Sequence, residues 1–236
     1  MPFFTSIKPE TERRKVHIKF DNTPSIHHKF NFKFSKNIIK NKQVLDVGCW
    51  TGQFEMLAAP YTKSIIGIDP NKEAILYAKK NVLSSSFQVG NALNVPFNKS
   101  TFDVVLFLDV LEHLPKNTEL TALKEINRVL KSNATLILST PNYHPLSNAM
   151  DPAFFLIGHR HYSLHSLQQM LNSTGFSIVK THQAAGLITF LAINLDLFYK
   201  HILNKELNYP SWMTKRIYSE YIKGGFGANY VIAKKL

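Results

Sequence analysis

The chain has 236 residues and a mass of 26.9 kDa, the size of one ordinary domain or of one domain with appendages. It is 44% hydrophobic and 19% charged, with 10 Gly and 11 Pro, and this composition excludes a disordered, collagen-like or coiled-coil protein. Cys49 is the single cysteine, which excludes an internal disulfide framework and a cysteine-rich zinc site.

The net charge of +12 at first suggests a protein that binds nucleic acid or a membrane surface. The charge is unevenly distributed, because residues 1–43 carry +7 and residues 198–236 carry +5, whereas residues 44–197 are neutral. We therefore divide the chain into a basic N-terminal arm or helix, residues 1–40, and one domain, residues 41–236. Solvated basic ends are the favoured interpretation, and an anionic acceptor or surface is the alternative.

The N-terminus has no apolar run of signal-peptide length. The longest apolar stretch, residues 184–199, is interrupted by polar residues and is shorter than the roughly 20 residues of a membrane-spanning helix. These observations predict a cytoplasmic protein. Peripheral membrane contact through residues 187–203 stays open, although a helix packed on the domain or over its site is the favoured interpretation.

Short apolar runs alternate with segments of helical periodicity from residue 43 onward, and a short helix within residues 30–39 precedes them. The predicted strands are residues 43–48, 64–69, 86–90, 102–109, 134–140, 176–182 and 228–235. The predicted helices are residues 53–59, 72–82, 119–130, 163–173 and 184–203. Ser163 is a plausible N-cap and Gly175 a plausible C-terminal stop for the fourth of these helices.

Continuous apolar strands alternating with helices indicate an α/β fold, a doubly wound and mostly parallel sheet with helices on both faces. Ligands bind such sheets at the carboxyl ends of the strands. The polar stretch of residues 142–161, which follows the fifth strand, is unusually long for a connection and is expected to be functional.

The turn after the first strand reads Gly-x-x-x-Gly, from Gly48 to Gly52, and opens a helix. Glycine lets a ligand approach the main chain. A dinucleotide-binding fingerprint from Gly48 requires glycine at positions 50 and 53, where Trp50 and Gln53 stand, so a dehydrogenase is disfavoured.

Together with Asp46, this turn resembles the first motif of the class I S-adenosylmethionine-dependent methyltransferases, with Trp50 in place of the middle glycine. Three later segments resemble the family in the same order. They are Asp69-Pro70 after the second strand, Asn91-Ala92 after the third, and Asp109-Val110 after the fourth.

The resemblance implies a seven-stranded sheet of order 3-2-1-4-5-7-6 with strand 7 antiparallel, and S-adenosyl-L-methionine as cofactor. Asp69 would hold the ribose hydroxyls, since a carboxylate can accept from both members of a cis-diol. Asn91 and Ala92 would contact adenine. The implied cofactor-binding residues are Asp46, Gly48, Cys49, Trp50, Gly52, Asp69, Pro70, Asn91, Ala92, Asp109 and Val110.

Transfer of an already activated methyl group needs alignment and, for some acceptors, a base. We expect no metal requirement. The candidate bases are His113, His144, His159, His161, Tyr143 and Tyr162, and we single out His113 and His161. Residues 158–163 resemble a segment that borders the acceptor pocket in small-molecule methyltransferases of the ubiquinone-biosynthesis O-methyltransferase type, and residues 184–205 fall where the family often inserts a lid or acceptor-binding element.

The leading hypothesis is a methyltransferase that modifies a small-molecule acceptor, lipid-linked or anionic, at oxygen. The second is an RNA or protein methyltransferase that uses the basic ends, which is disfavoured because the ends lack Gly/Arg-rich tracts and any recognisable RNA-binding module. A non-catalytic cofactor-binding module of the same fold is the third. The sequence leaves the acceptor and the oligomeric state undetermined.

Overall fold

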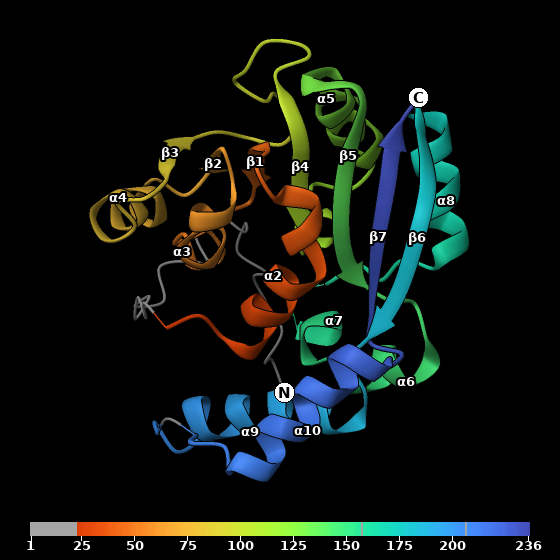
Figure 1. The fold of residues 1–236 in the computed structure, drawn as a ribbon. Coiled ribbons are helices and arrows are strands. Elements are labelled where there is room, and N and C mark those ends of the chain that lie inside the picture. Colours follow the sequence, from red (N-terminus) through yellow and green to blue (C-terminus); the bar gives the residue numbers. More distant parts are fainter. Residues whose placement is uncertain (1–22, 157, 206) are drawn as a thin grey trace, which may run out of the picture.

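The computed structural model describes residues 23–156, 158–205 and 207–236 (Figure 1). Residues 1–22 of the predicted N-terminal arm lie outside the described residues, so the arm and its boundary at residue 40 stay predictions.

One seven-stranded sheet has the order β3-β2-β1-β4-β5-β7-β6. The pairs β1–β2, β1–β4, β2–β3 and β4–β5 are parallel, whereas β7 runs antiparallel to both β5 and β6. This arrangement confirms the predicted doubly wound fold and strand order. The strands are β1 (Gln43–Val47), β2 (Ser64–Asp69), β3 (Ser86–Val89), β4 (Phe102–Leu108), β5 (Leu130–Pro141), β6 (Phe176–Ala184) and β7 (Ala228–Lys235).

Helices cover both faces of the sheet (Figure 1). They are α2 (Ile26–Ile39), α3 (Gln53–Ala58), α4 (Lys72–Asn81), α5 (Glu119–Val129), α6 (Pro145–Met150), α7 (Pro152–Leu156), α8 (Leu164–Ser173), α9 (Leu187–His201) and α10 (Ser211–Lys223). Short 3-10 turns, η1 (Ala59–Tyr61) and η2 (Leu111–His113), complete the described elements.

Strand β4 shows why its sequence is continuously apolar. Val105 and Phe107 join the core under α5 and α8, whereas Val104 and Leu106 join the core under α2 and α3. Successive side chains of a strand point to opposite faces, so a central strand covered on both sides must be apolar at every position.

Three helical features differ from the sequence expectations. Helix α2 begins at Ile26, earlier than expected, where the side chain of Ser25 accepts from the backbone of His28 and caps the helix. The polar stretch of residues 142–161 contains α6 and α7, both of which start at a proline in the first helical position. Helix α10 was not predicted, because its apolar side chains are interspersed with four charged ones.

None of the helices within the described ranges combines the length and the apolar character that a bilayer-spanning segment needs.

Helix α2 is tied to the carboxyl end of β4 through His27. Its Nε2 lies 3.0 Å from Asp109 Oδ2 and 2.9 Å from the Tyr230 hydroxyl oxygen. Burial opposes protonation of His27, but the charge of Asp109 and its hydrogen bond to His27 together outweigh burial and raise the pKa of His27 above 6.5. Burial likewise opposes ionisation of Asp109, yet His27 and the hydroxyl of Ser139 lower the pKa of Asp109.

This ion pair predicts a pH-dependent stability. Because folding raises the pKa of His27, its contribution to the stability of the fold is complete below pH 6.5 and is lost as the pH rises through the pKa of folded His27. Because folding lowers the pKa of Asp109, its contribution is lost only at acid pH. His27→Gln should therefore lower the melting temperature by about 2–4 °C at pH 6, for a pair worth about 1 kcal/mol. The difference should vanish at pH 9, and an equal difference at both values would contradict the ion pair.

Candidate cofactor and acceptor site

The turn after β1 brings a main-chain loop against the end of β4. Gly48 and Gly52 adopt left-handed backbone conformations, with φ of 92° and 80°. A Cβ added at Gly48 would lie 2.3 Å from Cγ2 of Val110, so only glycine fits this approach. Trp50, in the position of the family's middle glycine, is itself left-handed, with φ of 49°. Tryptophan thus keeps a glycine-like backbone here.

Cys49 turns its side chain away from the turn and into the core beside Ile75 and Ala78 of α4. Burial, together with nearby carboxyl groups, raises the pKa of the Cys49 thiol well above its usual range. The buried side chain leaves the backbone of Cys49 as the part that borders the turn.

Asp69 joins the turn to the ends of β2 and β3. Its Oδ2 accepts from the backbone N–H of Trp50 at 3.2 Å, and its Oδ1 accepts from that of Asn71 at 2.8 Å. Its backbone carbonyl accepts from Gly90 N–H at 3.1 Å. The carboxylate is buried at the carboxyl edge of the sheet, where its two oxygens suit the hydroxyls of a ribose. Pro70 follows it and is exposed.

Two further carboxyl groups, Asp46 and Glu55, are buried beneath the turn. Burial, reinforced by the charge of Asp69, raises the pKa of Asp46 to about 7. Burial and the charge of Asp46 raise the pKa of Glu55 well above its usual range. A Cβ at Gly67 would lie 2.6 Å from Glu55 Oε1, so glycine provides the space for this acid. These buried acids suit a cationic ligand above them, because a nearby positive charge favours the ionised form of Asp46.

The segment expected to read adenine follows β3. Asn91 is exposed, and its side-chain oxygen accepts from the backbone N–H of Leu93 at 2.9 Å, so it stabilises its own turn. Ala92 is buried and packs in the same core as Ile68 of β2. The segment lies at the same sheet edge as Asp69, through the bond from Gly90 to Asp69.

Asp109 directly follows β4 in a left-handed conformation, with φ of 54°. Its Oδ1 accepts from the Ser139 hydroxyl at 2.8 Å, and its Oδ2 faces His27. The structure therefore brings Val110 against Gly48 and gives Asp109 contacts to β5 and α2. All the sequence-predicted cofactor residues lie at or just below the carboxyl edge, and their individual roles stay predictions.

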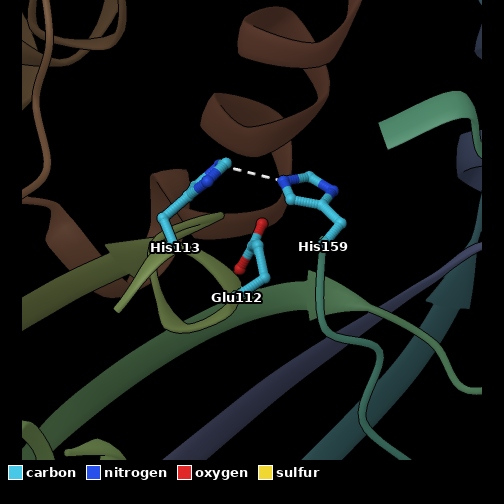
Figure 2. Close-up of side chains that lie close together, drawn as sticks. All are labelled: Glu112, His113 and His159. Atoms are coloured by element: carbon cyan, nitrogen blue, oxygen red, sulfur yellow. Dashed lines mark hydrogen bonds between the residues drawn. The ribbon is translucent and has the colours of Figure 1, made fainter. Parts of the chain in front are cut away.

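A cluster of three histidines and one aspartate lies beyond this edge. His113 ends η2, one turn after Asp109, and its Nε2 lies 3.2 Å from Nε2 of His159 (Figure 2). Nδ1 of His159 lies 3.4 Å from Asp151 Oδ2. The loop after β5 thus carries an imidazole and a carboxylate to the turn after β4.

His161, the second histidine singled out from the sequence, has a fully buried side chain. Its Nε2 lies 2.9 Å from Asp151 Oδ2 and its Nδ1 lies 2.7 Å from Asn148 Oδ1. Burial opposes ionisation of Asp151, but the contacts with His159 and His161 lower its pKa. His161 therefore faces the carboxylate that holds His159, and a catalytic role for it stays a prediction.

Arg160 and Tyr162 hold the loop to the body of the protein. Arg160 forms an ion pair with Glu119 and donates to the carbonyl of Leu111 at 3.1 Å. The Tyr162 hydroxyl donates to Glu119 at 3.1 Å. These contacts hold the loop beside η2.

Two overlapping groups of three side chains could each hold a metal ion. Within each group, every residue offers one ligand atom, and these atoms lie within 4.8 Å of one another. The groups are Glu112, His113 and His159, drawn in Figure 2, and Asp151, His159 and His161. Glu112 is buried and accepts from the Thr140 hydroxyl at 3.0 Å, and burial raises its pKa well above the usual range. A protonated carboxyl is a poor ligand, so the second group has the better donor set for a divalent cation.

Sequence reasoning did not assign site roles to Asp151, Glu112 and His27. Asp151 lies in the long polar stretch, where an acid beside several histidines was the available signal. Glu112 precedes His113 directly. His27 gave no usable signal, because its partner Asp109 is distant in sequence and belongs to another element.

A hollow of about 570 Å³ lies at the opposite end of the sheet, lined by residues that include Lys42, Asp103 and Lys131. These residues begin or precede β1, β4 and β5. Parallel sheets bind ligands at the carboxyl ends of their strands, so this hollow is not the cofactor site.

Comparisons with known proteins match the part of the sequence that forms the carboxyl edge of the sheet. A family described as "Methyltransferase domain" matches residues 45–138. The ubiquinone biosynthesis O-methyltransferase of Pelagibacter ubique is 31% identical over 117 residues, 48% of each chain. An uncharacterized protein of Methanocaldococcus jannaschii is 30% identical over 178 residues, 75% of this chain and 72% of the relative. The chain spans about half the length of the first curated relatives it matches.

A solved structure, the YcgJ protein of Bacillus subtilis, superposes with a TM-score of 0.61 at 19% identity, covering 89% of this chain and 98% of the other. That likeness supports the fold. Four observations indicate the same family: the strand order, the glycine turn against Val110, the acid at the end of β2 and the sequence matches. The chain belongs to the class I S-adenosylmethionine-dependent methyltransferases, and its cofactor is S-adenosyl-L-methionine.

Proposed function

We propose that this protein transfers the methyl group of S-adenosyl-L-methionine to an oxygen of a small-molecule acceptor, and that His113 accepts the proton which that oxygen loses. The contact of His113 with His159, held in turn by Asp151, is the observation that carries the proposal. Bound in the site, the cofactor supplies an activated methyl group on a sulfonium.

The chain's residues near the cofactor have two tasks. The turn from Gly48 to Gly52 and the carboxylate of Asp69 hold the nucleoside and amino-acid parts. Asp46 and Glu55 lie beneath a positively charged ligand and favour its binding as Asp46 ionises. These residues orient the methyl group towards the acceptor side, where η2 and the loop after β5 meet.

The imidazole pair provides a path for one proton. When His159 donates from Nδ1 to Asp151, its Nε2 is an acceptor for Nε2–H of His113. His113 Nδ1 is then the basic nitrogen. A proton taken up there gives an imidazolium that still donates to His159, within reach of the negative charge of Asp109. His161 acts on this path only through Asp151 and is a positioning residue.

An oxygen acceptor fits this arrangement, because a hydroxyl must lose a proton during methyl transfer and an imidazole near neutral pH can take it. The Pelagibacter relative is named as an O-methyltransferase of ubiquinone biosynthesis. That name supports oxygen chemistry and an apolar, lipid-linked acceptor for this chain, without identifying the compound.

The acceptor class is tested by incubating the full chain with methyl-labelled S-adenosyl-L-methionine and a cell extract, then separating nucleic acid, protein, lipid and small-molecule fractions. Label in the lipid or small-molecule fraction is expected, and its release by ether-cleaving but not by mild base treatment would distinguish an ether from an ester. Label confined to nucleic acid or protein would contradict the proposal and favour the basic ends as binding elements. No label in any fraction, with cofactor binding intact, would favour a non-catalytic module.

The base is tested with the acceptor fraction that carries the label. His113→Ala should lower the rate about 10²- to 10⁴-fold and remove its rise between pH 5 and 8, while cofactor affinity stays within about twofold. His159→Ala should shift the pH profile in the same direction. His165→Ala, which removes an exposed histidine of α8, is the matched control. Unchanged rates in both site variants would contradict the role of the pair.

The same assay with a chelator separates a proton path from a metal role. We expect no change in rate. Loss of activity that a divalent cation restores, and that His161→Ala abolishes, would replace the proton path with a cation held by Asp151, His159 and His161.

A further inference from the structure

Helix α9 exposes a straight row of large apolar side chains. The row recurs at intervals of four, four, three and four residues, which places every member within an arc of about 80° on the helix. Each member is between 42% and 67% exposed. The row consists of Leu187, Leu191, Leu195, Phe198 and Ile202, which we call the α9 stripe. An exposed apolar patch of this size marks a site of interaction.

The helix cannot turn to bury the stripe, because its other side is already packed and bonded. Phe190 and Ala192 are buried, and Phe190 stacks on Phe226. The carboxylate of Glu220 on α10 accepts from the backbone N–H groups of Gly186, Ile188 and Thr189, which fixes the first turn of α9. The stripe is therefore a built outer face of the described chain.

Exposed cations and an exposed tryptophan follow α9 in the chain and lie on its neighbour α10. Lys205 is exposed three residues beyond Ile202, the last member of the stripe. On α10, which contacts α9, Trp212 is 63% exposed and lies one turn from exposed Lys215 and Arg216. Figure 1 shows α9 and α10 together at the end of the molecule that also carries α6 and α7.

The two acids of α9 and α10 are held by other partners. Asp196 pairs with Lys200 at 2.6 Å, and Glu220 is turned towards the start of α9. Lys205, Lys215 and Arg216 are exposed. The end of the molecule formed by α9 and α10 thus combines an apolar row with exposed positive side chains.

We propose that the α9 stripe and the first two turns of α10 dock on an anionic lipid surface. Leucine and phenylalanine enter the acyl boundary, lysine and arginine meet the headgroups, and tryptophan occupies the interface between them. A second copy of this chain fits less well, since a symmetric contact through this face would bring the same cations together.

Docking would place the acceptor side of the methyltransferase towards the lipid. The Asn194 side chain of α9 donates to the carbonyl of Met150 at 2.9 Å, next to Asp151 in the histidine cluster. An acceptor dissolved in the bilayer would then approach the cluster from the docked end. This last step rests on the proposed function, whereas docking itself does not.

The test is flotation of the full chain with vesicles, without cofactor or acceptor. The protein should float with vesicles made of equal parts phosphatidylcholine and phosphatidylglycerol, float much less with phosphatidylcholine alone, and be released as salt rises. Equal recovery with both vesicle types, or none with either, would overturn the proposal. Because no methyl transfer is measured, failure here leaves the proposed function standing.

Variants locate the surface. Leu191→Asp combined with Phe198→Asp should weaken vesicle binding at least about tenfold, since each change removes an apolar side chain from the contact. Lys215→Gln combined with Arg216→Gln should remove the preference for phosphatidylglycerol. Leu83→Asp is the matched control, because Leu83 is 87% exposed outside the stripe. Unchanged melting temperatures establish that the variants fold.

Two results would overturn the assignment. The first is a stripe variant that binds the mixed vesicles as tightly as the native protein does. The second is a native protein that is dimeric in solution and becomes monomeric in the stripe variant, which would assign the face to a second copy.

Discussion

The hydrogen bonds of Asp69 hold the cofactor edge together. Its carboxylate accepts from Trp50 in the turn after β1 and from Asn71 before α4, and its backbone carbonyl accepts from Gly90 after β3. Three segments that are separate in the sequence are thereby fixed around one buried residue. The glycine turn, once held, meets Val110 at a distance that leaves no room for a Cβ at Gly48. A ligand at this edge therefore finds main chain, a carboxylate and the end of β4 already in place.

The acids below the turn carry a cost that a ligand can offset. Asp46 is buried in the first strand, and ionising it in the cofactor-free protein is unfavourable, as its pKa of about 7 shows. Glu55, fully buried beside it, has its pKa raised further. A cationic sulfonium ligand bound nearby favours the ionised carboxylate. The buried carboxyl groups therefore lower the stability of the cofactor-free fold and favour binding of a cationic ligand. Such perturbed acids are common at functional sites.

Much of the fold follows from local patterns in the sequence. The seven strands are short apolar runs bounded by turn residues, and Ser163 caps α8 as expected, accepting from Ser166 N–H at 3.1 Å. Strand order came from the family resemblance, because the pairing of β5 with β7 joins residues that no local pattern relates. The glycine turn and Asp69 could also be predicted from the local sequence. The turn depends on the backbone freedom of glycine, and Asp69 depends on its position at the end of an apolar strand.

The acceptor side was less accessible to prediction. His113 and His161 were singled out, but only the folded loop shows that His159 contacts His113 and that His161 faces Asp151. Helices α6 and α7 bring Asp151 to this point, and both lie in a stretch whose polar composition indicates a loop. The contact of His27 with Asp109 and the exposed row on α9 depend on how helices pack, which periodicity alone leaves undecided.

Isothermal titration calorimetry with S-adenosyl-L-methionine and, separately, with NAD tests the central claim most directly. The native chain should bind S-adenosyl-L-methionine and not NAD. Asp69→Asn keeps a side chain of the same size but loses the charge and one acceptor, so it should bind at least about tenfold more weakly while its melting temperature establishes that it folds. Absence of S-adenosyl-L-methionine binding by the native protein, or tighter binding of NAD, would contradict the account.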